Sequence, residues 1–335
     1  MREASHILTD LFNRQHTYLR ISIIERCNLQ CTYCMPEEGL QLSPRSHLMS
    51  YEEIYTIAKT FVEHGVTKIR LTGGEPLIRK DIHVILEKLS SLNVELSITT
   101  NAVLVDKYID VLKKYGVKKI NVSLDSLLPE KFKQITRRND FEKVYQNIHL
   151  LVNEGFKVKI NTVLIKDFND DEINDFIEFS KDLPISVRFI EFMPFNGNKW
   201  NLNKLVSYED IMHKASEKYP QKLIQRIEDA PNDTSKNFKI KSYRGSFAVI
   251  SSVSNPFCDS CNRIRLTANG RLKNCLFSAK ELDLLSALRQ DEPIEPIIEK
   301  VIHRKQKVRG GMDTMETLQE PKIHSKNRSM ITIGG

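Results

Sequence analysis

The sequence predicts an α/β fold built around a parallel β-sheet, with a smaller region following it. From residue 17 to about residue 192, short runs rich in β-branched residues alternate with longer amphipathic stretches. Six such runs separated by helical stretches favour a parallel sheet, since parallel strands need long crossover connections. After Pro194 the alternation stops. The spacing does not decide between a partly closed β/α barrel and an open, doubly wound sheet.

The first two hundred residues supply the six predicted strands and the helices between them. The predicted strands are residues 18–24, 66–72, 94–100, 117–124, 156–165 and 185–192. The first helix has clear ends, because Ser50 and Glu53 form a capping-box pattern and Gly65 follows the last apolar turn. We assign residues 1–200 to this first domain.

The remaining chain is predicted to form hairpins, short helices and a tail. A helix is expected over 206–219, followed by a turn or mobile loop over 228–237. Two hairpins are expected, one turning at Arg244-Gly245 and one at Asn269-Gly270. Helical segments follow near 279–289 and 293–305. We assign 201–306 to a second domain and 307–335 to a mobile tail.

Composition limits where the protein works and what it binds. Of its 335 residues, 40% are hydrophobic and 28% charged, which is typical of a soluble globular protein. We expect a cytoplasmic protein, because the first twenty residues are polar and no apolar run is long enough to span a membrane. Clustered cysteines in that compartment indicate metal or redox chemistry. The net charge of +7 suits an anionic ligand and also an ordinary solvated surface.

The first cysteine triplet follows the first predicted strand. Cys27, Cys31 and Cys34 have the spacing C-x3-C-x2-C. Three thiolates on a four-iron cluster leave one iron free to bind a small molecule. A zinc ion would need a fourth ligand, and no histidine lies between His16 and His47. Unliganded thiols, or a zinc knuckle completed from elsewhere, remain the alternatives.

The second triplet spans the Asn269-Gly270 hairpin. Cys258 and Cys261 form C-x2-C, and the hairpin returns Cys275 towards them. A second cluster with an open iron, or a structural zinc with a distant fourth ligand, fits this set.

Two further features suggest a ligand site. Gly73 and Gly74, in "LTGGEP", permit close approach of a ligand to the backbone, although such a pair is often only a turn. Arg263 and Arg265 lie on one face of a strand, an arrangement that suits a phosphate chain or else a solvated hairpin face.

Polar residues also recur at period two on the predicted strands. Lys68 and Arg70 share a face, as do Lys159 and Asn161, and Asn121, Ser123 and Asp125. The residues alone favour an outward orientation of Lys68, Arg70 and Lys159 near strand ends, or pairing with carboxylates.

The ordered set of motifs resembles a known family. The cysteine spacing at the end of the first strand resembles the signature of radical S-adenosylmethionine enzymes, which have partial or full β/α barrels. "RCNLQCTYCMP", "KIRLTGGEP", "INVSLDSL", "FCDSCNRIRLTANGRLKNC" and the terminal "GG" together resemble the GTP 3′,8-cyclases of molybdenum cofactor biosynthesis. The resemblance implies a partial (β/α)6 TIM-type barrel with a smaller C-terminal domain carrying a second cluster.

The resemblance also assigns roles to residues of this sequence. It implies two [4Fe–4S] clusters, one on Cys27, Cys31 and Cys34 and one on Cys258, Cys261 and Cys275. S-adenosylmethionine would contact Tyr33, Gly74, Ser123 and Met193. The implied GTP contacts are Arg20, Lys68, Arg70, Thr99, Lys159, Arg188, Arg263 and Arg265. Arg263, Arg265, Gly334 and Gly335 would act in catalysis, with the final glycines entering the cavity.

The implied reaction removes hydrogen from ribose C3′ of GTP and joins C3′ to guanine C8. An electron donor, a homodimer and a downstream enzyme that takes the product are the implied partners, without nucleic acid or membrane. The sequence departs from the family pattern at two places. Ala102 stands where the family usually has glycine, and "IIER" before Cys27 stands where the family usually has "VTDR". A peptide-modifying radical enzyme and a zinc-stabilised nucleic-acid-binding module are the rival functions.

Overall fold

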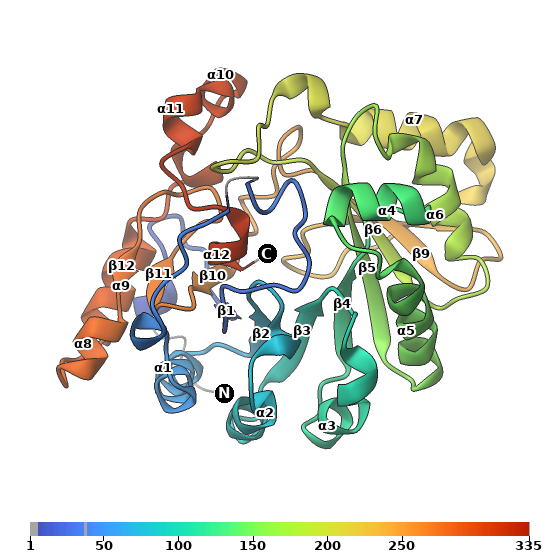
Figure 1. The fold of residues 1–335 in the computed structure, drawn as a ribbon. Coiled ribbons are helices and arrows are strands. Elements are labelled where there is room, and N and C mark those ends of the chain that lie inside the picture. The colour runs from blue at the N-terminus through green and yellow to red at the C-terminus, as the bar shows by residue number, and fades with distance from the viewer. Residues whose placement is uncertain (1–5, 37–38, 335) are drawn as a thin grey trace.

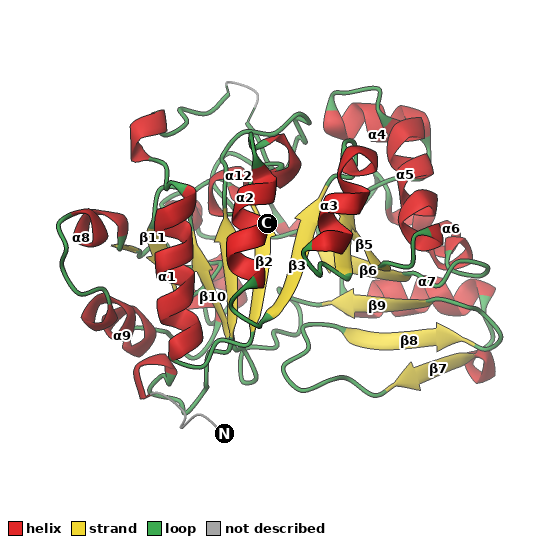
Figure 2. Ribbon diagram, turned by 90° about the horizontal axis from the view of Figure 1, so that it is seen from below, coloured by secondary structure: helices red, strands yellow, loops and turns green. Residues whose placement is uncertain are grey.

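The computed structural model describes residues 6–36 and 39–334 and is built on one sheet of twelve strands. Figures 1 and 2 show the sheet curving around a central space, with helices on its outer side. The strands are β1 Tyr18–Ser22, β2 Lys68–Thr72, β3 Glu95–Thr100, β4 Lys119–Ser123, β5 Lys157–Leu164, β6 Ser186–Glu191, β7 Ile224–Ile227, β8 Lys236–Ile240, β9 Ser246–Ile250, β10 Arg263–Leu266, β11 Arg271–Lys273 and β12 Leu282–Asp283.

The predicted six-stranded parallel sheet is confirmed. Strands β1 to β6 lie side by side in chain order, and every neighbouring pair is parallel. The helices between them are α1 Tyr51–Glu63, α2 Ile82–Ser90, α3 Ile109–Lys114, α4 Pro129–Thr136, α5 Phe141–Asn153 and α6 Ile173–Phe179. The capping box of Ser50 and Glu53 starts α1 as predicted.

Residues after 200 add strands to both edges of this sheet. β9 pairs in parallel with β6 and continues to the antiparallel strands β8 and β7, while β10 pairs in parallel with β1 and continues to β11 and β12. The sheet order ends in β12 on one side and β7 on the other, so the barrel is partial. Both predicted hairpins are present.

The predicted tail contains helices. The remaining helices of the chain are α7 Tyr208–Lys218, α8 Leu285–Arg289, α9 Glu295–His303, α10 Met315–Gln319, α11 Pro321–His324 and α12 Met330–Ile333, and the last three lie in the predicted tail. Leu318, Ile331 and Ile333 are buried, so apolar packing holds these parts of the tail against the rest of the fold. The mobility of the tail stays a prediction. The predicted helix near 279–289 is also shorter, because Leu282 and Asp283 pair with β11 instead.

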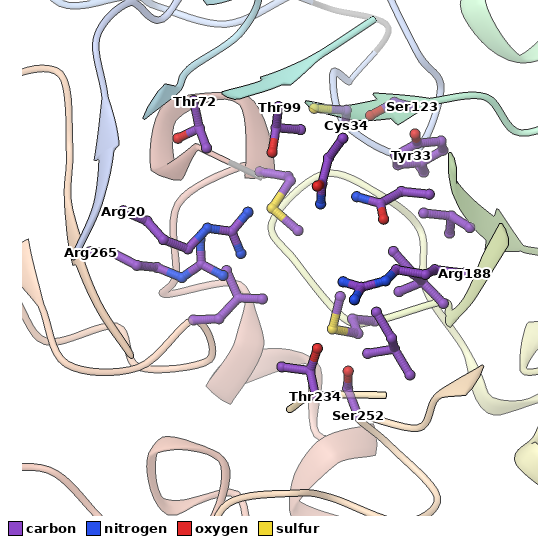
Figure 3. A pocket seen from close by; sticks show the side chains of 18 of the residues that line it. Arg20, Tyr33, Cys34, Thr72, Thr99, Ser123, Arg188, Thr234, Ser252 and Arg265 are labelled. Carbon is purple, nitrogen blue, oxygen red and sulfur yellow. The ribbon is translucent and has the colours of Figure 1, made fainter. Parts of the chain in front are cut away.

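The two faces of the parallel strands have different chemistry. On one face, residues such as Leu19, Ile69 and Ile120 are fully buried in a single apolar core. The alternate residues are polar and face the inside of the barrel, as the arginines of Figure 3 illustrate. The sheet thus turns a period-two sequence pattern into a polar chamber inside an apolar shell.

Candidate active site

A cavity of about 300 Å³ occupies the inside of the partial barrel, and all six cysteines line it. Cys27, Cys31 and Cys34 come from the loop after β1, whereas Cys258, Cys261 and Cys275 flank β10 and β11. Because β10 lies directly beside β1, the hairpin places the second triplet on the same chamber as the first. The two triplets, more than 200 residues apart in the sequence, therefore share one site.

The first cysteine loop is fixed by hydrogen bonds on two sides. Its backbone donates to the end of α4, from Gln30 N to Thr136 O at 3.0 Å and from Thr32 N to Ile135 O at 2.8 Å. The Asn101 amide lies 3.7 Å from Cys27 Sγ. Burial raises the pKa of Cys27 to about 11, and it raises the pKa of Cys31 and Cys34 further. Three partly buried thiols with raised pKa values fit a metal centre, since a bound metal removes the thiol proton itself.

The glycine pair packs directly against this loop. A Cβ on Gly74 would overlap the carbonyl of Arg26 and lie 3.0 Å from Cys27 N. Gly74 N donates to Ile24 O at 2.7 Å, and Gly74 also lines the cavity. The sequence "GG" is thus required by close backbone packing as well as by any ligand that binds there.

The second triplet has cationic surroundings. Lys305 is buried and its Nζ lies 3.4 Å from Cys261 Sγ, while the backbone N–H of Arg309 donates to Cys258 Sγ at 3.4 Å. Burial alone would raise the pKa of Cys261, but Lys305 and Arg263 lower it to about 6. Burial raises the pKa of Cys258. Cys261 is thereby prepared to be a thiolate ligand.

Neither triplet forms a compact site for one ion. Within residues 6–36 and 39–334, no three His, Cys, Asp or Glu side chains converge closely enough to hold a single metal ion. A four-iron cube is ligated at separate corners by cysteine sulfurs, and each triplet supplies three such donors of the right chemical type.

Arginines dominate the rest of the cavity wall. Figure 3 shows Arg20 and Arg265 entering the cavity from one side and Arg188 from the other. The lining arginines are Arg20, Arg70, Arg188, Arg263, Arg265 and Arg309. Burial, and then neighbouring cations, lower the pKa of Arg20, and burial lowers those of Arg188 and Arg265 to about 10. Such crowding of like charge is costly unless an anion binds among them.

Several buried polar atoms around the arginines have no hydrogen-bond partner within the described residues. These atoms are Tyr18 Oη, Arg20 Nε, Thr99 Oγ1, Asn121 Oδ1, Asn161 Oδ1, Arg188 Nε and Arg263 Nη2. Buried polar groups are normally satisfied, so a concentration of unsatisfied donors and acceptors in one chamber indicates a polar ligand. The mixture of guanidiniums, hydroxyls and amides suits a phosphorylated, hydrogen-bonding molecule such as a nucleotide.

The predicted lysines are placed differently from the arginines. Lys68 does not line the cavity, and its Nζ lies 2.8 Å from Glu95 Oε1. This ion pair agrees with the pairing with carboxylates that the residues alone favoured. Lys159 is also outside the lining, but burial and Arg188 lower its pKa to about 7. The outward orientation expected for Arg70 is wrong, since Arg70 is buried, lines the cavity and donates to Ser97 at 3.2 Å.

The predicted S-adenosylmethionine contacts gather near the first triplet. Tyr33, Gly74, Ser123 and Met193 all line the cavity. Tyr33 Oη donates to Asp125 Oδ2 at 2.8 Å, and Val163 N donates to the other carboxylate oxygen at 2.8 Å. Burial raises the pKa of Asp125 to about 6. We did not predict a role for Asp125, although it continues the polar period-two face of Asn121 and Ser123.

The end of the chain reaches the cavity through α12. Arg265 Nη1 donates to the carbonyl of Gly334 at 2.7 Å, and Met330 lines the cavity. A Cβ on Gly334 would overlap Thr72 Oγ1 and lie 2.9 Å from Ser22 Cβ. The tail is anchored by Arg328, whose Nη2 donates to Glu281 at 2.6 Å. Gly335, which we predicted beside Gly334, lies outside the described residues.

Comparison with known proteins supports the same interpretation. Residues 21–180 match the family model of the radical SAM superfamily, and residues 185–310 match the model described as molybdenum cofactor synthesis C. A protein of Arabidopsis thaliana named GTP 3′,8-cyclase, mitochondrial, is 47% identical over 96% of this chain and 83% of its own length. The GTP 3′,8-cyclase of Clostridium botulinum is 42% identical over 89% of this chain and 93% of its own length.

Other relatives are longer or more distant. Human molybdenum cofactor biosynthesis protein 1 is 43% identical over 98% of this chain, which spans only 51% of that protein. A crystal structure of Streptococcus suis SuiB bound to S-adenosylmethionine matches with a TM-score of 0.58 at 18% identity, covering 85% of this chain and 68% of that one. At this identity the match supports the fold.

Proposed function

The chain belongs to the GTP 3′,8-cyclase family of the radical S-adenosylmethionine superfamily, and from this we propose that it converts GTP to (8S)-3′,8-cyclo-7,8-dihydroguanosine 5′-triphosphate. This reaction is the first step of molybdenum cofactor biosynthesis. The observation that carries the proposal is the single cavity lined by both cysteine triplets and by buried arginines.

The first triplet would hold the superfamily's [4Fe–4S] cluster. Cys27, Cys31 and Cys34 would be its ligands, and the cluster would supply an electron for the reductive cleavage of S-adenosylmethionine, the radical source of the superfamily. Tyr33, Gly74, Ser123 and Met193 would orient that cofactor, and the hydrogen bond from Tyr33 to Asp125 ties the cysteine loop to the segment after β4.

The arginines bind and orient GTP. Arg70, Arg188 and Arg263 line the cavity. Lys68 shares β2 with Arg70, and Lys159 lies on β5; both lysines are outside the lining. Bidentate bonds from guanidiniums to phosphate oxygens hold the chain of phosphates. Arg20 and Thr99 have unsatisfied buried atoms that a nucleotide could satisfy. The helix α12, whose residue Met330 lines the cavity and whose Ile331 and Ile333 are buried, would help to exclude water from the bound substrate.

A second [4Fe–4S] cluster on Cys258, Cys261 and Cys275 would complete the site. The proposal is supported by the donor set and by Lys305 and the Arg309 N–H, which stabilise anionic sulfur. Its open iron would contact the guanine. Arg263 and Arg265 lie two and four residues after Cys261 and would act beside that cluster, while the Gly334 carbonyl fixes the orientation of Arg265. Gly335 would extend the same contact.

An anaerobic assay with GTP and S-adenosylmethionine, read by mass spectrometry, tests the function. We expect 5′-deoxyadenosine to form only with reductant and to form faster with GTP, together with a cyclised product of the same mass as GTP. A peptide-modifying enzyme would instead cleave the cofactor and leave GTP unchanged. Iron analysis separates the zinc-binding alternative, because two clusters require about eight irons per chain and matching sulfide.

The partners and location remain predictions. The chemistry requires an electron donor and a downstream enzyme for the product, and light scattering during gel filtration tests the predicted homodimer. No helix among the described residues is long and apolar enough to cross a membrane. The predicted cytoplasmic location is testable by fractionation, and one relative carries a mitochondrial name.

A further inference from the structure

An acidic loop, residues 228–235, connects β7 to β8 and reaches the cationic wall of the cavity. Thr234 lines the cavity, and Figure 3 shows it on the side opposite Thr99 and Ser123. The loop lies at the β7 edge of the sheet, yet Asn232 O accepts from Arg263 Nη1 of β10 at 3.1 Å. It therefore bridges two strands that the sheet itself leaves far apart.

Hydrogen bonds within the loop and from β8 hold Asp233 in a fixed position. Its Oδ1 accepts from Thr234 N at 3.0 Å, and its Oδ2 accepts from Asn237 Nδ2 at 3.0 Å. Asn237 is fixed in turn by Asp229, which accepts from its backbone N at 3.1 Å and its side chain at 2.8 Å. The carboxylate of Asp233 is thus pre-positioned, and little conformational entropy opposes its interactions.

The same carboxylate faces the cations of the cavity. Asp233 Oδ1 lies 3.8 Å from Arg188 Nη2, and the side chain of Arg188 is only 8% exposed. Asp233 also acts on Lys159, where it opposes the lowering of the pKa by burial and by Arg188. Of the carboxylates in the described part of the chain, Asp233 alone forms an ion pair with an arginine that lines the cavity.

We propose that Asp233 is a tethered anion that keeps inorganic phosphate out of the triphosphate subsite, and so determines the specificity of that subsite. The inference rests on the proposed function. A free phosphate ion would have to compete with a carboxylate that is permanently present at high local concentration. GTP also gains binding energy from its base, its ribose and the other arginines, and can therefore bind despite Asp233.

The direct test compares phosphate binding by the full chain and by its Asp233→Asn variant. Asparagine preserves the size and the acceptor oxygen but removes the charge. We expect inorganic phosphate to compete with GTP at about tenfold lower concentration in Asp233→Asn than in the wild type. Without ligand, the variant should melt at a lower temperature, because Arg188 loses its counter-ion, and phosphate alone should raise that temperature more than in the wild type.

Glu228→Gln is the matched control. It removes one charge from the same loop, and Glu228 is exposed to solvent. Equal phosphate competition in the wild type and Asp233→Asn would overturn the proposal, as would the same gain in Glu228→Gln. If Asp233→Asn fails to fold, Asp233→Ser tests the same point with a smaller acceptor.

The failure of this inference can be distinguished from failure of the proposed function. A wild-type chain that does not bind GTP contradicts the function, whereas the thermal shift with phosphate alone still tests Asp233. If the wild type binds GTP and Asp233→Asn does not change the competition by phosphate, only the role of Asp233 is contradicted.

Discussion

Replacement of Gly334 by alanine should remove the tail from the cavity and leave the rest of the fold intact. Gly334 has φ of 85°, in the left-handed region, and an added Cβ would overlap Thr72 Oγ1 and approach Ser22 Cβ to 2.9 Å. The left-handed conformation alone costs an alanine ~1–2 kcal/mol. With the overlap added, the docked tail should lose at least ~2 kcal/mol, which reduces its occupancy roughly 30-fold.

The consequence should appear in catalysis and in local protection. Gly334→Ala breaks the bond from Arg265 to the Gly334 carbonyl, so we expect cyclised product to fall by at least tenfold. Cluster content should be unchanged, and α12 should exchange its amide hydrogens faster than in the wild type. Gly311→Ala is the control, because it has a similar positive φ of 99° but its Cβ would meet only Gln306 Cγ at 3.7 Å. Wild-type turnover in Gly334→Ala, or equal losses in both variants, would refute this reasoning.

Three other predictions follow from the site. The pKa of Lys159 is lowered to about 7, well below its ordinary value, by burial and by Arg188, so without nucleotide the free energy of unfolding should rise as pH increases from 7 to 10. GTP raises this pKa again, so GTP affinity should fall over the same range by calorimetry, and Lys159→Met should remove both trends. Lys305→Met should lower the reduction potential of the second cluster in redox titrations followed by electron paramagnetic resonance, because a buried cation beside Cys261 is lost; an unchanged potential would contradict that role. Cys258→Ser should reduce the iron content by about half and leave cleavage of S-adenosylmethionine by the first cluster measurable; loss of all iron would show that the triplets are not independent.

The local patterns predicted much of the fold because each strand and helix carries its own signal. The six parallel strands follow from β-branched runs, and Ser50 with Glu53 sets the start of α1. The placement of β9 and β10 at opposite edges of the same sheet was not predictable from a single sequence. It depends on pairings between residues far apart in the chain, which periodicity does not encode.

The cysteines were predictable from spacing, but the residues that support them were not. Lys305 lies at the end of a predicted helix and Arg309 in the predicted tail, and only the fold brings them to Cys261 and Cys258. Asp233 lies in a sequence typical of a solvated loop. At Ala102 the sequence did give a signal, because the related family usually has glycine at this position. The backbone of Ala102 has a φ of 61°, a conformation that glycine adopts readily.

The central claim is that one cavity places the cofactor within reach of the ribose of GTP. Anaerobic turnover with GTP deuterated at C3′ tests it most directly, with the deuterium content of 5′-deoxyadenosine measured by mass spectrometry. We predict that the deoxyadenosine carries deuterium from GTP in step with product formation. Deoxyadenosine that forms in the presence of this substrate but contains no deuterium would contradict the account.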